Sequence, residues 1–221
     1  MKAIIFDMDG VIIDSEPIHF EVERALLEEL GGTFDREFHE SLVGTVDELM
    51  WSTFREKFDL SIPLNEIIEL KKERFLNNLS RVPLVDGVTN LMSSLHKEGY
   101  SLALASSNNR KSVDAIIEKF GLDKYLHYSI SGDDVEHGKP NPEIFLTAAK
   151  NMNVDPSECL VIEDAGNGVK AAKAASMKCI GFKNHNSGNQ DLSEADLIIN
   201  SYDEINLGDL RALFNGEVHD E

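Results

Sequence analysis

Short apolar runs with high strand propensity alternate with helical patterns along most of this chain. Between successive runs, apolar residues recur every three or four positions, as expected for helices packed on a core. A chain with this alternation folds as a parallel sheet covered by helices on both faces, so we predict a three-layer α/β fold. The predicted strands are 2–6, 100–106, 127–131, 159–163, 178–182 and 196–200. The predicted helices between them are 87–99, 112–121, 141–153, 165–176 and 205–214.

One interval of the chain lacks strand-like runs. From about 15 to about 82 the pattern is that of amphipathic helices only. This stretch is too long to be a single connection between two strands of the sheet. We therefore predict two domains: an α/β core formed by 1–14 and 83–221, and an inserted helical domain formed by 15–82. The connections near 14–17 and 80–86 would act as a hinge. The predicted insert helices are 18–31, 34–44, 46–58 and 64–79.

The composition is that of a globular protein with a strongly acidic surface. Hydrophobic residues make up 42% and charged residues 28% of the 221 residues, unlike in disordered or membrane chains. The net charge of -19 repels phosphate backbones and anionic lipids, which argues against nucleic-acid and membrane partners. Cys159 and Cys179 open apolar runs without metal-site or disulfide spacing, and the sequence has no signal peptide or membrane-spanning run. We expect a cytoplasmic monomer with a frayed tail at 215–221.

Two carboxylates stand where the first predicted strand ends. Asp7 and Asp9 follow the apolar run 2–6, and the ligand site of a parallel sheet lies beyond the carboxyl ends of its strands. Their offset of two residues directs both side chains to the same side, so their repulsion calls for a cation or for different protonation states. The pair therefore suggests a nucleophile and a general acid beside a hard metal ion.

The ends of three further predicted strands carry polar residues that suit the same site. The second strand ends in hydroxyl and amide residues at the start of a helix, a natural cradle for an anion. The third is followed by a lysine directly before a proline, and the fourth by a pair of carboxylates. These residues are Ser106, Ser107, Asn108, Lys139, Glu163 and Asp164. Four strand ends thus deliver carboxylates, hydroxyls and one amine to one edge of the sheet.

Four ordered motifs give the chain a family resemblance. The segments DMDGVIID, ASSN, KPNPEIF and VIEDAGNGVKAA resemble the signatures of the haloacid dehalogenase (HAD) superfamily. The helical interval resembles the cap of its β-phosphoglucomutase-like and sugar-phosphatase branch, so the likeness covers nearly the whole chain. The resemblance implies a Rossmann-like core with an inserted small α-helical cap domain. It also implies a Mg²⁺-dependent phosphatase acting on a small phosphorylated metabolite, such as a sugar phosphate.

The resemblance implies a role for each residue of the predicted site. Asp7 would attack phosphorus and form an aspartyl phosphate, while Asp9 would protonate the leaving oxygen and afterwards activate water. Lys139 would offset the negative charge of Asp7 and of the phosphate. The residues assigned to phosphate and substrate binding are Ser106, Ser107, Asn108 and His19. The groups assigned to Mg²⁺ are Asp7, the backbone carbonyl of Asp9, Glu163 and Asp164.

Three activities stay open: a phosphatase, a β-phosphoglucomutase, and a non-catalytic module that binds phosphometabolites. The module is disfavoured because the full set of reactive residues is present, and a dehalogenase is disfavoured because its chemistry uses neither Asp9 nor Mg²⁺. A mutase must hold a distal phosphate, and the β-phosphoglucomutase pattern has an arginine where this chain has Asp47. That carboxylate would repel the phosphate unless Arg55, Lys71 or Lys72 compensates. We favour the phosphatase, whose substrate the sequence does not identify.

Overall fold

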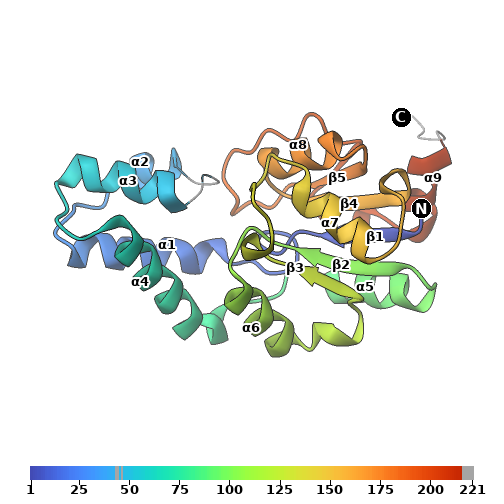
Figure 1. Cartoon of the computed structure of the whole chain (residues 1–221), viewed down its shortest axis with the longest axis horizontal. Helices are drawn as coiled ribbons and strands as arrows, with labels where there is room; N and C mark the ends of the chain where they lie inside the picture. Colours follow the sequence, from blue (N-terminus) through green and yellow to red (C-terminus); the bar gives the residue numbers. More distant parts are fainter. Residues whose placement is uncertain (43–44, 46, 216–221) are drawn as a thin grey trace.

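Parallel strands form the centre of the fold in this computed structural model, which describes residues 1–42, 45 and 47–215 (Figure 1). The strand order is β3-β2-β1-β4-β5-β6, and Phe6 in β1 pairs with Leu104 on one side and Ile162 on the other. The order reverses between β1 and β4, where parallel sheets open a ligand crevice. The strands are β1 (Ala3–Phe6), β2 (Ser101–Ala105), β3 (Tyr128–Ile130), β4 (Cys159–Glu163), β5 (Lys178–Phe182) and β6 (Leu197–Ile199).

Helices cover both faces of this sheet. In β1, Ile4 and Phe6 pack into one apolar cluster and Ala3 and Ile5 into the other, and all four are fully buried. This double burial explains why the strands read as continuous apolar runs. One cluster is covered by α5 (Val88–Lys97), α6 (Arg110–Phe120) and α9 (Leu207–Asn215). The other is covered by α7 (Glu143–Asn151) and α8 (Gly166–Ala174). The predicted α/β class is confirmed.

The interval without strands forms a group of helices beyond one end of the sheet (Figure 1). It has an apolar cluster of its own, in which Leu26, Trp51, Phe54 and Ile67 are buried. Its base is continuous with the sheet's core, because Phe75 packs into the cluster beneath α5 and α6. The helices of this group, here called the insert, are α1 (Glu16–Glu29), α2 (Arg36–Glu40), α3 (Asp47–Phe58) and α4 (Leu64–Asn77).

The two connections between the insert and the sheet are bonded to each other. Ile13 and Leu84 form an antiparallel bridge, and the Asp14 N–H donates to the Pro83 carbonyl at 3.0 Å. Lys119 of α6 donates from the other side to the carbonyls of Leu79 and, at 2.6 Å, Val82. The chain therefore leaves and re-enters the sheet domain as one short paired ribbon.

The remaining segments are turns and short helices that the sequence does not predict. The 3-10 helices are η1 (Leu79–Arg81), η2 (Leu122–Lys124), η3 (Gly132–Asp134), η4 (Pro156–Glu158) and η5 (Tyr202–Glu204). Helix α2 is shorter than the predicted 34–44, although 43 and 44 lie outside the described residues, as does 216–221 of the predicted tail. Cys159 and Cys179 are free and buried. In the described part of the chain, no helix is both long and apolar enough to cross a membrane.

Candidate active site

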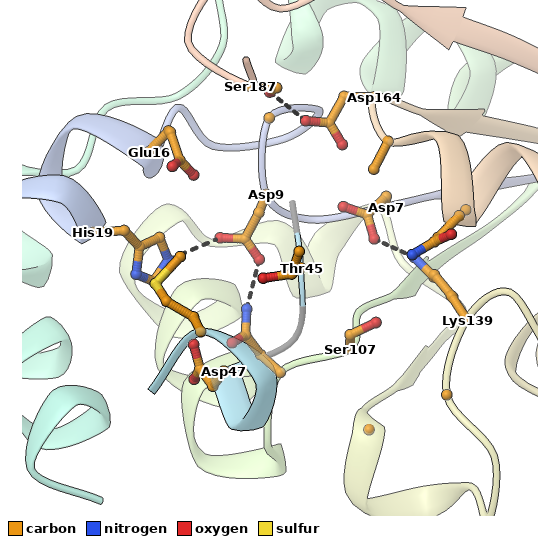
Figure 2. Close-up of a pocket in the computed structure, with 18 of the residues that line it drawn as sticks. Asp7, Asp9, Glu16, His19, Thr45, Asp47, Ser107, Lys139, Asp164 and Ser187 are labelled. Carbon is orange, nitrogen blue, oxygen red and sulfur yellow. Dashed lines mark hydrogen bonds and ion pairs between the residues drawn. The ribbon is translucent and has the colours of Figure 1, made fainter. Parts of the chain in front are cut away.

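A cavity of about 460 Å³ lies beyond the carboxyl ends of β1, β2 and β4, between the sheet and the insert (Figure 2). The sheet side carries most of the residues predicted from the four strand ends, and the insert closes the opposite side with α1, α3 and α4. The structure therefore brings the predicted residues of distant segments into one chamber. Those lining it are Asp7, Asp9, His19, Ser107, Asn108, Lys139, Glu163 and Asp164.

Three buried carboxylates form the floor of the cavity. Asp7, Glu163 and Asp164 each offer an oxygen, and these oxygens lie within 4.8 Å of one another. Burial raises the pKa of Asp7 to about 8, although Lys139 opposes the shift. Burial, followed by the charges of Glu163 and Asp7, raises the pKa of Asp164 well above its usual value. This cluster therefore carries more negative charge than its protein surroundings compensate.

Lys139 lies against the cluster and joins two of its members. Its Nζ donates to Asp7 (Figure 2). It also donates, at 2.7 Å, to Oε1 of Glu163. Burial alone would lower the pKa of this amine, but the charges of Asp7 and Glu163 more than offset it, and its pKa is raised. Lys139 is therefore an ammonium group directed at the carboxylate that was predicted as the nucleophile.

Asp9 has different partners from Asp7. Its Oδ2 accepts a hydrogen bond from Asn108 Nδ2 at 2.5 Å, and its Oδ1 accepts one from Ser15 Oγ at 2.5 Å. Burial would raise the pKa of Asp9, but hydrogen bonding and charge from His19, together with Ser15, lower it overall. Although β1 ends at Phe6, Asp7 and Asp9 line the same cavity, each with its own partners.

His19 borders the same carboxylate from the insert. Its Nε2 lies 3.6 Å from Asp9 Oδ1, and its ring stacks on Phe75 with the centroids 4.2 Å apart. The residue therefore faces the cavity from the start of α1. Its assignment to the substrate side stays a prediction.

The loop after β2 borders the cavity with Ser107 and Asn108. Ser106 is 1% exposed and is not a lining residue; its hydroxyl accepts the Asn108 N–H at 3.1 Å. Ser107 and Asn108 line the cavity, and Asn109 caps α6 by accepting the Ser112 N–H at 2.8 Å. The cavity thus meets the N-terminus of a helix, where anions are favoured. Phosphate binding by Ser106, Ser107 and Asn108 stays a prediction.

A second layer of residues supports the acidic cluster. Ser187, in the loop after β5, donates to Oδ2 of Asp164, and Asn184 Nδ2 donates to the Gly10 carbonyl at 3.0 Å. Gly10 has a φ of +69°, and a Cβ there would lie 1.9 Å from Asp164 Oδ2. Only glycine fits this turn, because the backbone both needs a positive φ and passes directly over the carboxylate.

A buried ion network forms the insert side of the cavity. Lys71 Nζ lies 2.7 Å from Asp47 Oδ1 and 3.5 Å from Glu23 Oε1. Glu23 Oε2 lies 2.6 Å from His39 Nε2. Burial would lower the pKa of Lys71, but the charges of Asp47 and Glu23 raise it overall. Of the cations named as possible compensation for Asp47, Lys71 is therefore the one that pairs with it.

The other two candidate cations of the insert do not reach the site in the same way. Lys72 lines the cavity and pairs with Glu69 at 3.3 Å, whereas Arg55 is not among the lining residues. Of the stretch compared with the mutase pattern, 43, 44 and 46 lie outside the described residues.

Several residues of the site were not predicted from the sequence, and Lys71 was named only as a cation that could compensate Asp47. Glu23 and Lys71 occupy positions within the apolar stripes of α1 and α4, and charged residues at such positions are a signal that sequence reasoning could have used. Ser15 precedes the first helix as serine often does. Ser187 lies in a loop that has no pattern to identify it.

The family model described as a haloacid dehalogenase-like hydrolase matches residues 1–176. This chain belongs to that family. The predicted membership of the haloacid dehalogenase superfamily is thereby confirmed. The parallel-sheet fold of this hydrolase is the one that its structural neighbours share.

Relatives of this HAD-like hydrolase include both kinds of enzyme considered above. The phosphorylated carbohydrates phosphatase of Thermotoga maritima is 33% identical over 184 residues, covering 81% of this chain and 84% of the relative. The beta-phosphoglucomutase of Bacillus subtilis is 30% identical over 216 residues, covering 94% of this chain and 92% of the relative. The crystal structure of CbbY from Rhodobacter sphaeroides in complex with phosphate matches with a TM-score of 0.86 and 27% sequence identity. The match covers 96% of this chain and 99% of the CbbY chain. The predicted β-phosphoglucomutase-like branch and phosphatase-class enzyme are confirmed by such relatives.

Proposed function

We propose that this chain is a Mg²⁺-dependent phosphatase that hydrolyses a small phosphorylated metabolite, in particular a sugar phosphate, through an aspartyl phosphate on Asp7. The observation that carries the proposal is the contact of Lys139 with Asp7 and Glu163 at the floor of the cavity. It sets one carboxylate beside both an ammonium group and a potential metal site. The T. maritima relative, which is named for phosphorylated carbohydrates, supports this substrate class.

The acidic cluster fits a hard divalent cation. Asp7, Glu163 and Asp164 supply closely spaced oxygen donors, which Mg²⁺ prefers, and their accumulated charge favours a cation. We propose Asp7 and Asp164 as ligands, with the Asp9 carbonyl and Glu163 assisting. When bound, Mg²⁺ would supply positive charge that keeps the carboxylates ionised and reduces the repulsion of the phosphate.

The reaction then divides between two aspartates. A carboxylate oxygen of Asp7 attacks phosphorus while the bond from phosphorus to the substrate oxygen breaks, and Asp9 gives its proton to that oxygen. In the second half, Asp9 takes a proton from water, and the water oxygen displaces Asp7 from phosphorus. Lys139 stays positively charged throughout and offsets the charge of the phosphoryl oxygens.

We further propose that 15–82 is a cap domain that closes on the core formed by 1–14 and 83–221. The cavity is bounded by both parts, so their relative position controls its shape and its access. The paired ribbon at Ile13 and Leu84 supplies one place for the closing motion. Closure would exclude water from the aspartyl phosphate until the leaving group has departed.

Replacing the nucleophile tests the proposal. We expect wild-type protein with Mg²⁺ to release phosphate from sugar phosphates, and Asp7→Asn to lose several decades of turnover. The matched control is Asp203→Asn, which removes an exposed carboxylate outside the cavity and should retain wild-type turnover. Metal-independent release, or near-normal turnover of the Asp7→Asn variant, would contradict the proposal.

A mutase is the second candidate, because Lys71 places an amine on the insert wall of the cavity and a mutase is among the relatives. The test supplies β-glucose 1-phosphate with a trace of the 1,6-bisphosphate and Mg²⁺, and follows glucose 6-phosphate and inorganic phosphate together. We expect phosphate release to dominate, since Asp47 and Glu23 already neutralise Lys71. Efficient formation of glucose 6-phosphate with little phosphate release would establish the mutase instead.

A further inference from the structure

The insert wall of the cavity carries more carboxylates than amines. Two of the acidic side chains come from α1 and two from the start of α3, whereas both amines come from α4. The lining carboxylates are Glu16, Glu23, Asp47 and Glu48, and the lining amines are Lys71 and Lys72. With a phosphate placed at Asp7 and Lys139, the distal end of a substrate would face this wall.

Both amines are already paired within the insert. Lys71 is 6% exposed and contacts Asp47 at 2.7 Å and Glu23 at 3.5 Å. Lys72 pairs with Glu69 at 3.3 Å. In the described parts of the insert, no further lysine or arginine lines the cavity. A second phosphate or a carboxylate on the substrate would therefore have to compete with an existing carboxylate for any of these cations.

The same wall offers free hydrogen-bond acceptors. Lys71 contacts Oδ1 of Asp47, so Oδ2 is left without an ion-pair partner among the described residues, and the carboxylate is 24% exposed. Thr45 donates its hydroxyl proton to the Leu42 carbonyl at 2.6 Å, which leaves its oxygen as an acceptor. Figure 2 shows Glu16, Thr45 and Asp47 on the side of the cavity away from Lys139. Ionised carboxylates accept hydrogen bonds and donate none.

From this arrangement we propose that the substrate is a phosphomonoester whose distal end bears hydrogen-bond donors and no second anion. Hydroxyl groups of a polyol donate to these acceptors, and an ammonium group adds charge attraction. A distal phosphate or carboxylate offers neither, and meets a wall of the same sign. The inference rests on the proposed function, since it names the class of phosphorylated metabolite that this site takes.

Three ligand pairs that share a phosphate end test the proposal. Sorbitol 6-phosphate is compared with 6-phosphogluconate, fructose 6-phosphate with fructose 1,6-bisphosphate, and glucose 6-phosphate with glucosamine 6-phosphate. Dissociation constants are measured by calorimetry without added metal, and kcat/KM in parallel with Mg²⁺. We expect the acid and the bisphosphate to bind at least tenfold more weakly than their partners, and the amino sugar to bind as tightly as glucose 6-phosphate or more tightly.

A variant separates the wall from the overall charge of the protein. Asp47→Asn releases Lys71 from its closest carboxylate, so the discrimination against fructose 1,6-bisphosphate should shrink severalfold. The matched control is Glu56→Gln, which changes the net charge equally on the same helix but is exposed and outside the cavity. Its discrimination should equal that of the wild type.

The binding measurements test the inference about the substrate, and the rate measurements test the proposed phosphatase. Equal or tighter binding of the acid or the bisphosphate overturns the inference, as does the absence of binding by every ligand. An equal shift in both variants also overturns it, because discrimination would then follow net charge alone. The expected order of affinities without any phosphate release supports the inference and overturns the proposed phosphatase.

Discussion

Asp7 and Asp9 are separated by one residue but have opposite electrostatic surroundings. Burial raises the pKa of Asp7, whereas His19 and Ser15 hold the pKa of Asp9 below its usual value. The split follows from their partners: Asp7 joins the acidic cluster, and Asp9 accepts hydrogen bonds from Asn108 and Ser15. Without metal, the split favours a proton on Asp7 and an ionised Asp9, so bound Mg²⁺ and phosphate would have to reverse it before Asp7 attacks and Asp9 donates a proton.

Removing the Asp9 carboxyl should affect substrates according to their leaving groups. We expect Asp9→Asn to slow phosphoenzyme formation from a sugar phosphate by about 100-fold or more, because an alkoxide needs a proton to leave. p-Nitrophenyl phosphate has a good leaving group and should lose far less in this step. Rapid-quench measurement of the first turnover compares the two substrates, and equal losses would argue against Asp9 as the general acid.

Ser187 should act as a positioning residue for Asp164, to which it donates a hydrogen bond. Loss of a hydrogen bond to a metal-binding carboxylate typically weakens the metal site by about 10-fold to 100-fold. We therefore expect Ser187→Ala to need about tenfold more Mg²⁺, both for half-maximal activity and for half-maximal thermal stabilisation by the metal. Ser193→Ala, an exposed serine nearby in the chain, is the control and should need no more Mg²⁺ than the wild type. An unchanged Mg²⁺ requirement in the Ser187 variant would refute this role.

Individual site residues can be predicted from the sequence where they stand at the ends of buried strands. Asp7, Asp164 and the residues after β2 could be found because an apolar run stops directly before them. The contacts of Asp9 could not be found, since they join it to Ser15 before α1, to His19 in α1 and to Asn108 in the loop after β2. Lys71 was named as a cation that could compensate Asp47, but its burial and its contact with Glu23 were not predicted.

The strands are the elements that the sequence predicts best. Each predicted run ends within one residue of the observed strand, because burial on both faces leaves an uninterrupted apolar segment between polar turns. The 3-10 helices were not predicted. They depend on single turns such as Ser131 with Asp134, which have no periodic pattern.

Helix α6 is linked to the second connection of the insert by one amine. Lys119 donates to two carbonyls of that connection, and burial lowers its pKa. We expect Lys119→Met to lower the free energy of unfolding by about 1 kcal/mol, the scale of lost hydrogen bonds to partly exposed carbonyls. Chymotrypsin should also cleave near Leu79 faster.

Urea denaturation and the cleavage rate check this expectation. Lys111→Met, on an exposed position of the same helix, is the matched control and should change neither. If both variants lose the same stability, the effect belongs to helix charge and not to the contact with the connection.

The whole molecule carries a net charge of -19, yet its proposed substrate is an anion. The overall field repels the substrate, whereas Lys139, together with bound Mg²⁺, would attract its phosphate locally. Salt screens the distant charges more than the buried contacts, because the Debye length falls to about 8 Å at physiological ionic strength. We expect kcat/KM for a sugar phosphate to rise severalfold from low to physiological salt at constant Mg²⁺.

Steady-state kinetics in a series of sodium chloride concentrations measures this rise. The value of kcat should change little, since bound substrate is already within the cavity. A fall of kcat/KM with added salt would mean that local cations, and not the net charge, control the encounter.

The arrangement of the insert over the sheet was predictable only in outline. Its helices follow from their amphipathic patterns, and its position follows from the two crossings near Asp14 and Pro83. The chemistry of the cavity wall does not follow, because it requires Asp47 of α3 and Lys71 of α4 to meet in three dimensions. Interactions between elements far apart in sequence have no local signal.

The pairing of Ile13 with Leu84 has a consequence for how such a protein can be altered. Because both crossings lie side by side in one hydrogen-bonded ribbon, everything between them forms a cassette with adjacent ends. A cassette from a relative could be grafted at this junction without cutting a strand of the sheet. The reaction belongs to the sheet domain and the selectivity to the insert, so the two are inherited as separate parts. Related enzymes can then change their substrate specificity while keeping the same chemistry.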